Sequence, residues 1–430
     1  MDATTYQDYV NILHEELVPA MGCTEPIAIA YAAAVARQTL GRLAQRMEVE
    51  ASGNIIKNVK SVFVPNTGGL RGIPAAAAAG MAAGDPALEL EVLSSIGEGK
   101  QAAIRQYLAD TPIAVKLADS PFIFDIAIRA WAGEDSALVR IVNYHTNIVR
   151  VERNGQVLKE VEAQAAAEEG LTDKSVLTVE GILEFAREAA LADVEEAVGR
   201  QVRYNTAIAQ EGLRGDYGAN IGKVLLATYG DDVKIRAKAM AAAGSDARMN
   251  GCGLPVVIVS GSGNQGLTAS LPVVEYAKEL GADWETTLRA VLVSDLITIH
   301  LKAEIGRLSA YCGAVSAGCG SGAGIAWLYG REKEPQALLK DVSHTIVNAL
   351  AVDSGIVCDG AKASCAAKIA SAVDAGLLGF YMYQNGQQFR GGDGIISKGV
   401  EETIRNIGLL ATQGMRETDR EILDIMTTRC

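Results

Sequence analysis

The feature that most constrains the fold is a long run without any charged side chain, from residue 308 to residue 330. A run of this length has to be shielded from water, either inside a bilayer or inside the protein. Six of its residues are glycine, and most of the others are alanine, serine or cysteine, so its transfer into lipid is poorly favoured. We therefore expect a glycine-rich segment of the protein interior and no membrane span.

The composition of the chain favours closely packed helices. Hydrophobic residues make up 49% of the 430 residues, enough for a sizeable core, whereas aromatic residues make up only 5%. Alanine and glycine fill the difference, which suits helices with small contact residues better than a large sheet sandwich. A chain of this length exceeds one compact core, so two or three domains are expected.

The charge balance argues against a nucleic-acid partner. The net charge is −13, from 52 acidic and 39 basic side chains. An acidic surface repels phosphate backbones, and no basic run interleaved with aromatic residues occurs. The segment from Met1 to Asp8 has neither a basic stretch nor an apolar core, so we expect no secretory signal and a cytoplasmic protein.

Two helices are predicted near the N-terminus, over residues 5–19 and 26–40, because apolar residues recur there at helical spacing. The turn between them contains Gly22 and Pro26, and Thr24 followed by proline is typical of a helix start. Cys23 would then lie at a helix N-terminus, where the positive end of the helix dipole favours a thiolate.

A small α+β unit follows. Strands are predicted from alternating or β-branched runs, and Asn154-Gly155 is a favoured hairpin turn. The predicted strands are 61–64, 122–131, 137–142 and 148–152, of which the last two are expected to pair.

An acidic, alanine-rich stretch around 160–173 separates this unit from a region with helical periods and glycine-rich loops. The predicted fold class is α+β, a small mixed α/β domain plus a larger, predominantly α-helical catalytic domain. The predicted divisions are N-terminal helices packing on the catalytic domain, an α+β domain and a helical domain, over residues 1–44, 45–170 and 171–430.

The seven cysteines suggest metal binding or catalysis, since no export signal places the chain where disulfides form. Two pairs, Cys312/Cys319 and Cys358/Cys365, are each seven residues apart, and seven residues of straight helix rise about 10 Å. That is far for two ligands of one small cluster, although Gly360 could break the second segment. With no histidine in either segment, an iron cluster is favoured over structural zinc, with simple packing of small cysteines as the alternative.

Two glycine-containing motifs could bind anions. Gly261–Gly266 precedes an apolar helix over 267–280, and backbone amides at a helix N-terminus could hold a carboxylate, although an ordinary helix start has the same pattern. Pro65–Gly72 could bind an anion through Thr67 and Arg71, but we favour a simple turn. The four histidines form no recognisable metal or catalytic pattern, and no role is expected for His14, His145, His300 or His344.

Several segments, in the same order over nearly the whole chain, resemble the L-cysteine desulfidase family, a single-chain relative of the iron–sulfur L-serine dehydratases. They are Met21–Pro26, Pro65–Gly68, Asp246–Met249, Gly261–Gly266 and the cysteine segments 312–320 and 357–365. The resemblance implies a [4Fe–4S] cluster on three cysteines with one iron open. Its ligands would be Cys312, Cys358 and Cys365, with Cys319 competing with Cys312.

The resemblance also implies a reaction, β-elimination of L-cysteine to pyruvate, ammonia and sulfide. Cys23 falls where the family has its proposed catalytic base, and the dehydratase relatives have a Ser-His-Thr-type segment there, which favours a thiol substrate. The open iron would act as a Lewis acid on the leaving group. The implied substrate-binding residues are Thr24, Glu25, Asn66, Thr67, Ser262, Asn264 and Gln265.

Other functions stay open. L-Serine dehydratase is the nearest alternative, and D-cysteine is a further substrate candidate. A pyridoxal-phosphate lyase would use the Ser262–Gly266 loop and Lys234 or Lys238, and an iron–sulfur sensor would hold a cluster without turnover. Cys430 could reach the open iron as a displaceable fourth ligand, and a homodimer fits the size and the small surface residues.

Overall fold

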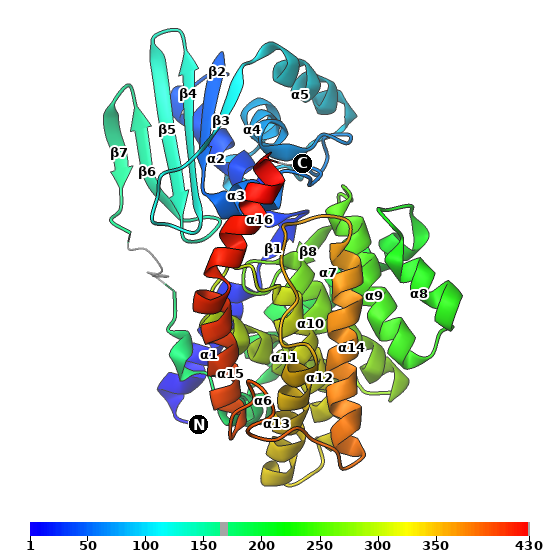
Figure 1. Ribbon diagram of the computed structural model, residues 1–430. Helices are drawn as coiled ribbons and strands as arrows, with labels where there is room; N and C mark the ends of the chain where they lie inside the picture. Colours follow the sequence, from blue (N-terminus) through cyan, green and yellow to red (C-terminus); the bar gives the residue numbers. More distant parts are fainter. Residues whose placement is uncertain (164–170, 429–430) are drawn as a thin grey trace.

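The computed structural model describes residues 1–163 and 171–428, so the role predicted for Cys430 lies outside the described residues. A sheet region and a larger helical region are joined by the N-terminal helices and by the end of the chain (Figure 1). The predicted α+β class is confirmed, because the chain is mostly helical with one six-stranded mixed sheet in its N-terminal part.

The six strands run in the order β3-β2-β4-β5-β6-β7, parallel between β2 and β3 and antiparallel elsewhere. Their bounds are β2 Arg46–Ala51, β3 Ile113–Leu117, β4 Asp125–Ala132, β5 Asp135–Val142, β6 Ile148–Arg153 and β7 Gln156–Glu160. The predicted pairing of 137–142 with 148–152 is confirmed by the β5–β6 ladder. Asn154 and Gly155 have positive φ angles of 52° and 78° and make the β6–β7 turn, as expected for this dipeptide.

One predicted strand is wrong. Residues 61–64 follow α3 (Gly53–Val59) and make only a single bridge, between Phe63 and Arg71. The turn that follows holds this segment in a short loop of its own, so it does not join the sheet.

The two N-terminal helices pack differently, which corrects the expectation that both lie on the helical region. Helix α1 (Ala3–Glu16) contacts α7 (Leu191–Arg214), whereas α2 (Thr24–Leu40) packs on β4, β5 and α4 (Gly72–Ala83). The alanine-rich face of α2 makes this close packing against the sheet possible. Helix α5 (Glu98–Asp110) covers α4, and the 3₁₀ turn η1 (Pro86–Glu91) lies against α2.

The helical region is built around the uncharged run, which forms the buried helix α12 (Gly313–Gly330). This placement confirms the expected interior segment. Helices α10, α11, α13 and α14 surround it. The bounds are α6 Val179–Glu188, α8 Ile221–Tyr229, α9 Val233–Met249, α10 Gly263–Glu279, α11 Trp284–Ile305, α13 Pro335–Val352, α14 Cys365–Gln384, α15 Val400–Leu409 and α16 Arg416–Thr428.

Within the described residues, α14 is the helix long and apolar enough to cross a membrane by length and composition. It packs against α9, α12 and α13, and half of its most apolar stretch is buried inside the protein. These contacts are those of a core helix of the helical region.

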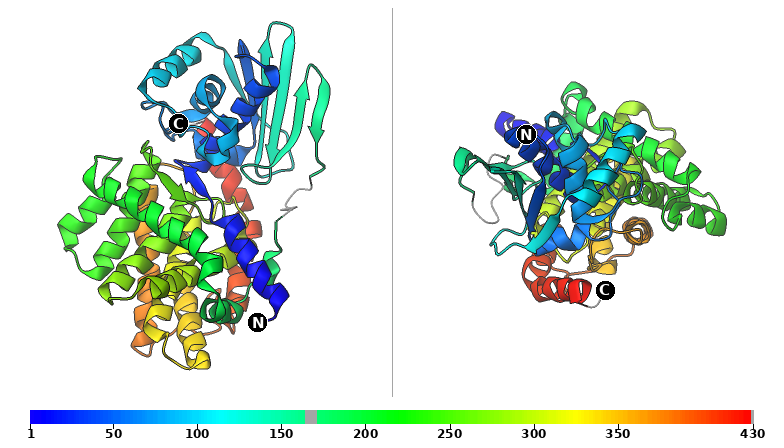
Figure 2. Two further views of the ribbon diagram at one scale, coloured as in Figure 1. Left: turned by 180° about the vertical axis from the view of Figure 1, so that it is seen from behind. Right: turned by 90° about the horizontal axis from the view of Figure 1, so that it is seen from above.

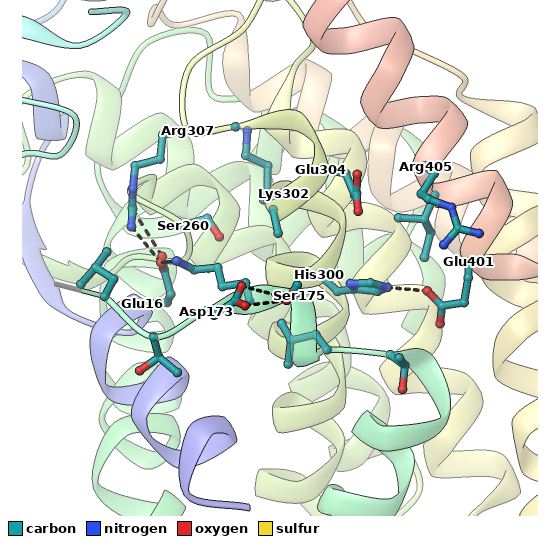
Figure 3. Close-up of a pocket in the computed structure, with 18 residues that line it drawn as sticks. Glu16, Asp173, Ser175, Ser260, His300, Lys302, Glu304, Arg307, Glu401 and Arg405 are labelled. Atoms are coloured by element: carbon teal, nitrogen blue, oxygen red, sulfur yellow. Dashed lines mark hydrogen bonds and ion pairs between the residues drawn. The ribbon is translucent and has the colours of Figure 1, made fainter. Parts of the chain in front are cut away.

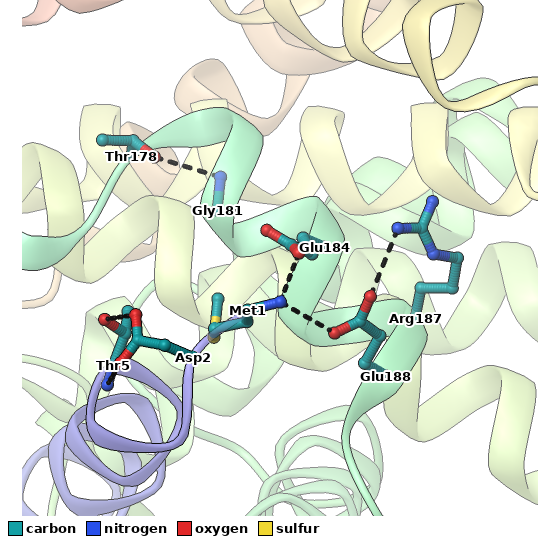
Figure 4. A network of polar contacts seen from close by, with 8 residues as sticks. All are labelled: Met1, Asp2, Thr5, Thr178, Gly181, Glu184, Arg187 and Glu188. Carbon is teal, nitrogen blue, oxygen red and sulfur yellow. Dashed lines mark hydrogen bonds and ion pairs between the residues drawn. The ribbon is translucent and has the colours of Figure 1, made fainter.

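Both ends of the described chain return to other parts of the molecule (Figure 2). Helix α16 leaves the helical region and packs on α3, where Lys57 forms an ion pair with Asp419 at 2.5 Å. At the other end, the amino group of Met1 contacts Glu184 and Glu188 of α6, at 2.5 and 3.3 Å (Figure 4). The short strands β1 (Pro19–Met21) and β8 (Pro255–Val257) also pair, which ties the start of α2 to the start of α10.

Helices α12 and α14 approach each other through glycine. A Cβ atom at Gly376 would lie 2.1 Å from the carbonyl oxygen of Gly318, and one at Gly318 would lie 2.3 Å from that of Ala372. Only glycine allows backbones this close. The approach matters for the site because Cys312 immediately precedes α12 and Cys365 begins α14.

The Gly376→Ala variant is therefore expected to be less stable by about 1–3 kcal/mol, since the added methyl group forces the two helices apart. Urea unfolding measures this change. Gly99→Ala is the matched control, because nothing lies within 4 Å of its added Cβ and its φ is not positive. Equal stability of the two variants would contradict the close α12–α14 contact.

Candidate active site

Two of the cysteines predicted as ligands are brought together by a short backbone pairing. Tyr311 and Val357 form an antiparallel bridge. The amide of Cys312 donates to the carbonyl of Ile356 at 2.9 Å, and the amide of Cys358 donates to that of Ala310 at 2.6 Å. Cys312 is the N-cap residue of α12, and its side chain hydrogen-bonds that of Cys358.

All three predicted ligands line one cavity of about 100 Å³. Cys312, Cys358 and Cys365 are each half-buried there. Cys319, the competing candidate, is not among the lining residues; it is buried two turns into α12, and its thiol donates to the carbonyl of Ile346 at 3.7 Å. Of the two candidates for the first ligand, Cys312 is therefore the one that lies beside Cys358 and Cys365.

Cationic groups lie near Cys358, whereas the pKa of Cys312 is raised by its hydrogen bond to Cys358 and by burial, and burial raises the pKa of Cys365. The pKa of Cys358 is lowered, first because it accepts a hydrogen bond from Cys312, and further because Lys57 and Lys362 face it. Asp359 holds both Lys362 and Lys368 at 2.5 Å and so fixes these ammonium groups beside the cysteines. Positive charge stabilises thiolates, the form in which cysteine binds metal.

Residues 1–163 and 171–428 contain no group of three or more His, Cys, Asp or Glu side chains arranged for a single metal ion. An iron–sulfur cluster is a different case, since it contains its own sulfides and is held by thiolates placed around a larger body. Here three thiols from two segments far apart in the sequence line one cavity, and Lys362 lies close to two of them. This donor set fits such a cluster.

Cys23 and Glu25, at the start of α2, also line the cavity, and Cys365 packs against the cluster that contains Cys23. The Cys23 thiol donates to one carboxylate oxygen of Glu25 at 3.0 Å, and Asn58 donates to the other at 3.0 Å. Thr24 does not line the cavity; its hydroxyl donates to the carbonyl of Gly261 at 2.9 Å. These bonds fix the first turn of α2 against the start of α10.

The expectation of an ionised Cys23 is wrong. Cys23 does lie at a helix N-terminus, as predicted, but burial raises the pKa of its thiol well above the ordinary value, and the nearby charge of Glu25 raises it further. Loss of water contact outweighs the helix dipole. The raised pKa and the 3.0 Å contact from the thiol to the Glu25 carboxylate both favour the protonated form of Cys23.

The glycine-rich motif supplies the third wall. Ser262, Asn264 and Gln265 line the cavity at the N-terminus of α10. Two of their carbonyl oxygens, Oδ1 of Asn264 and Oε1 of Gln265, are buried without a hydrogen-bond partner in the described structure. Unpartnered buried polar atoms are rare in folded proteins, and here they indicate a place for a polar ligand.

Like Thr24, the predicted substrate-binding residues Asn66 and Thr67 lie outside the cavity. Thr67 donates to the carbonyl of Val64 at 2.7 Å and accepts from the amide of Leu70 at 3.2 Å, while Asn66 donates to the carbonyl of Leu93 at 3.0 Å. Their polar groups stabilise the 65–72 turn. The alternative interpretation of this segment as a simple turn is the one that its contacts support.

Two residues that received no role in the sequence analysis also line the cavity, His145 and Arg248. His145 comes from the loop between β5 and β6, is 5% exposed and has an unpartnered Nε2. A lone histidine in a hairpin loop gives no sequence signal for this position. Arg248 belongs to the segment 246–249, which supports the family resemblance. The resemblance pointed to this segment but gave Arg248 no role.

His145 makes a testable contribution to pH-dependent stability. Burial lowers its pKa from 6.5 to about 4, so the folded state keeps it neutral while the unfolded chain binds a proton. Stability from this group is complete above pH 6.5 and is lost as the pH falls towards 4.

At about 1.4 kcal/mol per tenfold change in proton affinity, the loss amounts to about 3 kcal/mol. Urea unfolding at pH 7 and pH 4.5 should therefore show a smaller difference for His145→Gln than for the unaltered protein. An identical difference in both proteins would contradict a buried neutral imidazole.

A larger cavity of about 730 Å³ adjoins the small one (Figure 3). The two share Ser260, Lys302 and Arg307 as lining residues. Glu16 accepts hydrogen bonds from Arg307 at 2.8 Å and forms an ion pair with Lys174 at 2.9 Å, and His300 contacts Glu401 at 2.7 Å. The small cavity thus has a wide polar space beside it.

Comparison with known proteins identifies the group to which this fold and site belong. The family model described as the serine dehydratase alpha chain matches residues 89–424, which include the three cysteines and the start of α10. The chain is a member of this serine dehydratase alpha chain family. Cys23 and Glu25 precede the matched segment.

Full-length relatives cover the remaining residues. A UPF0597 protein of Desulfitobacterium hafniense is 58% identical over 425 residues, 99% of this chain and 97% of that protein. A UPF0597 protein of Lachnoclostridium phytofermentans is 51% identical over 421 residues (98% and 99%), and one of Treponema denticola is 45% identical over 435 residues (99% of each). Membership of the serine dehydratase alpha chain family identifies a dehydratase-like lyase and a family that uses iron–sulfur clusters.

Proposed function

We propose that this member of the serine dehydratase alpha chain family is a cytoplasmic L-cysteine desulfidase. Cys312, Cys358 and Cys365 would hold a [4Fe–4S] cluster, and the enzyme would convert L-cysteine and water to pyruvate, ammonia and sulfide. The observation that supports this most is that three thiols, the Cys23–Glu25 pair and the N-terminus of α10 line one small cavity.

The cluster, when bound, would supply a Lewis-acidic iron for the leaving group at the β-carbon. The chain itself has to remove the α-proton, and the residues suited to this are Cys23 and Glu25, whose side chains share a hydrogen bond. Glu25 can accept the thiol proton as Cys23 accepts the proton from the α-carbon, so the buried pair never has to carry two negative charges.

The leaving group departs as sulfide from the β-carbon and leaves an aminoacrylate, to which water adds before ammonia is released. Oδ1 of Asn58, whose amide donates to Glu25, is buried without a partner in the described residues and can accept a hydrogen bond from the substrate ammonium group.

L-Serine dehydratase is the second candidate, and the family match specifically favours it. The resemblance places Cys23 where the dehydratase relatives have a Ser-His-Thr-type segment, and this difference is the reason to prefer L-cysteine. D-Cysteine, the further substrate candidate, would present its α-proton from the opposite side, so its turnover relative to L-cysteine reports the stereochemistry of the site.

A pyridoxal-phosphate lyase has less support. Lys234 and Lys238, the candidates for its Schiff base, form ion pairs with Asp232 and Asp374 and do not line the cavity. The fold also lacks the alternating strand–helix order on which that interpretation depended.

The deciding experiment is anaerobic reconstitution with iron and sulfide, followed by measurement of pyruvate from L-cysteine, L-serine and D-cysteine side by side. Faster turnover of L-cysteine supports the proposal, and faster turnover of L-serine replaces it with the dehydratase. A bound cluster without turnover of any of the three would support the sensor alternative. A homodimer stays a prediction that light scattering of the same sample can check.

A further inference from the structure

Arg248 is a buried cation without a counter-ion. It lies on α9, is 3% exposed and lines the small cavity. In the described part of the chain no carboxylate forms an ion pair with it; its Nη1 contacts the sulfur of Met249 at 3.3 Å, and its Nε has no hydrogen-bond partner. Because a guanidinium stays charged even when buried, this arrangement calls for an anion.

The guanidinium lies against the first turn of α10. A Cβ atom at Gly263 would be 2.3 Å from Nε of Arg248, so only glycine leaves room for it there. The N-cap residue Ser262 makes no side-chain hydrogen bond to the helix, which leaves the first amides of this 17-residue helix without an intrahelical partner. A guanidinium and a helix N-terminus together form a strong site for a carboxylate.

The same cavity holds an anion at another point. Glu25 accepts from Cys23 and Asn58 and forms no ion pair with Arg248 within residues 1–163 and 171–428. Arg307, another cation of this wall, is paired with Glu16. Arg248, without an ion pair in the described residues, and the carboxylate of Glu25 both line this small cavity, and together they complement the two charges of an α-amino acid.

We propose that Arg248, together with the N-terminus of α10, binds the α-carboxylate of the substrate and restricts the enzyme to substrates with a free α-carboxylate. This inference deepens the proposed function and rests on it for the reaction. The ammonium group then lies towards Glu25 and the β-substituent towards Cys312, Cys358 and Cys365. Amines without a carboxylate, such as cysteamine, lack the group that Arg248 needs.

The test uses the anaerobically reconstituted protein with Arg248→Gln and Arg248→Lys. L-Alanine is the binding probe, because it has no leaving group and cannot be eliminated. The unaltered protein should be stabilised against heat by L-alanine but not by ethylamine. Arg248→Gln should lose this stabilisation and show a KM for L-cysteine raised about a hundredfold or more. Arg248→Lys should recover part of the binding, since it keeps the charge without the fork geometry.

Arg236→Gln is the matched control, on the same helix but paired with Glu275 and Glu279 outside the cavity, and it should leave KM unchanged. If Arg248 has only a structural role, ligand-free Arg248→Gln should melt at a lower temperature than the unaltered protein while its KM for L-cysteine stays unchanged. That result would overturn the inference. If the Gln variant does not fold, an Arg248→Lys variant with unaltered KM and L-alanine stabilisation overturns it equally. L-Alanine binding through Arg248 in a protein that eliminates neither L-cysteine nor L-serine would remove the proposed function and leave the carboxylate site standing.

Discussion

The Cys358→Ser variant is expected to lose the broad iron–sulfur absorbance and the formation of pyruvate together. Cys358 interacts with both other proposed ligands: it accepts a hydrogen bond from Cys312, and its charge contributes to raising the pKa of Cys365. A serine hydroxyl is a poor ligand for iron at neutral pH. Even residues that only support a ligand typically cost 10- to 100-fold in metal affinity, so we expect a loss of more than about a hundredfold. Anaerobic iron titration and pyruvate release measure the two effects.

Cys319→Ala is the control for this experiment. Cys319 sits on the same segment as Cys312, but its thiol faces the carbonyl of Ile346 inside the helical region. The variant should keep the cluster and its turnover, with only the modest stability cost of a small buried cavity. Loss of the cluster in Cys319→Ala and its retention in Cys312→Ala would show that the proposed ligand set is wrong.

The second large effect concerns proton transfer. Cys23→Ala should lower kcat by about 100- to 10,000-fold while the cluster absorbance is retained, because a positioned acid–base group contributes an acceleration of that size. The thiol is 3.0 Å from a carboxylate oxygen of Glu25, and the pair lines the cavity without belonging to the three proposed ligands. Exchange of the substrate α-proton with deuterium from heavy water should stop in this variant.

Cys252→Ala offers a comparison with another buried cysteine. Cys252 lies outside the cavity, close to Tyr217, and its loss should leave kcat unchanged. Glu25→Gln should resemble Cys23→Ala if the two act as a pair. A Cys23→Ala enzyme with kcat within tenfold of normal would instead assign the α-proton to Glu25 or His145 directly.

Local chemistry in the sequence was sufficient for much of the fold. The Gly22–Pro26 segment starts a helix at Thr24, Asn154-Gly155 closes a hairpin, and the uncharged run packs as a core helix. The first two outcomes depend on local backbone preferences, and the third on a composition that has to be kept from water, so each could be predicted without knowing which segments lie nearby. The strand prediction for residues 61–64 was wrong because a strand needs a partner strand, and this segment makes only one isolated bridge.

The candidate site depended far more on tertiary structure. Cysteine spacing could not choose between Cys312 and Cys319; the choice comes from the bridge between Tyr311 and Val357, which joins segments more than forty residues apart. His145 and Arg248 enter the cavity from the sheet region and from α9, and nothing in their local sequence marks them.

The protonation of Cys23 shows the same division most clearly. The sequence by itself determined that this cysteine stands at a helix N-terminus beside Glu25, because Gly22 and Pro26 set the local backbone. Only the tertiary structure decided that it is buried at 2% exposure, and burial removes the water that would stabilise a thiolate. Helix geometry is a local property, whereas solvation depends on which distant segments cover a residue.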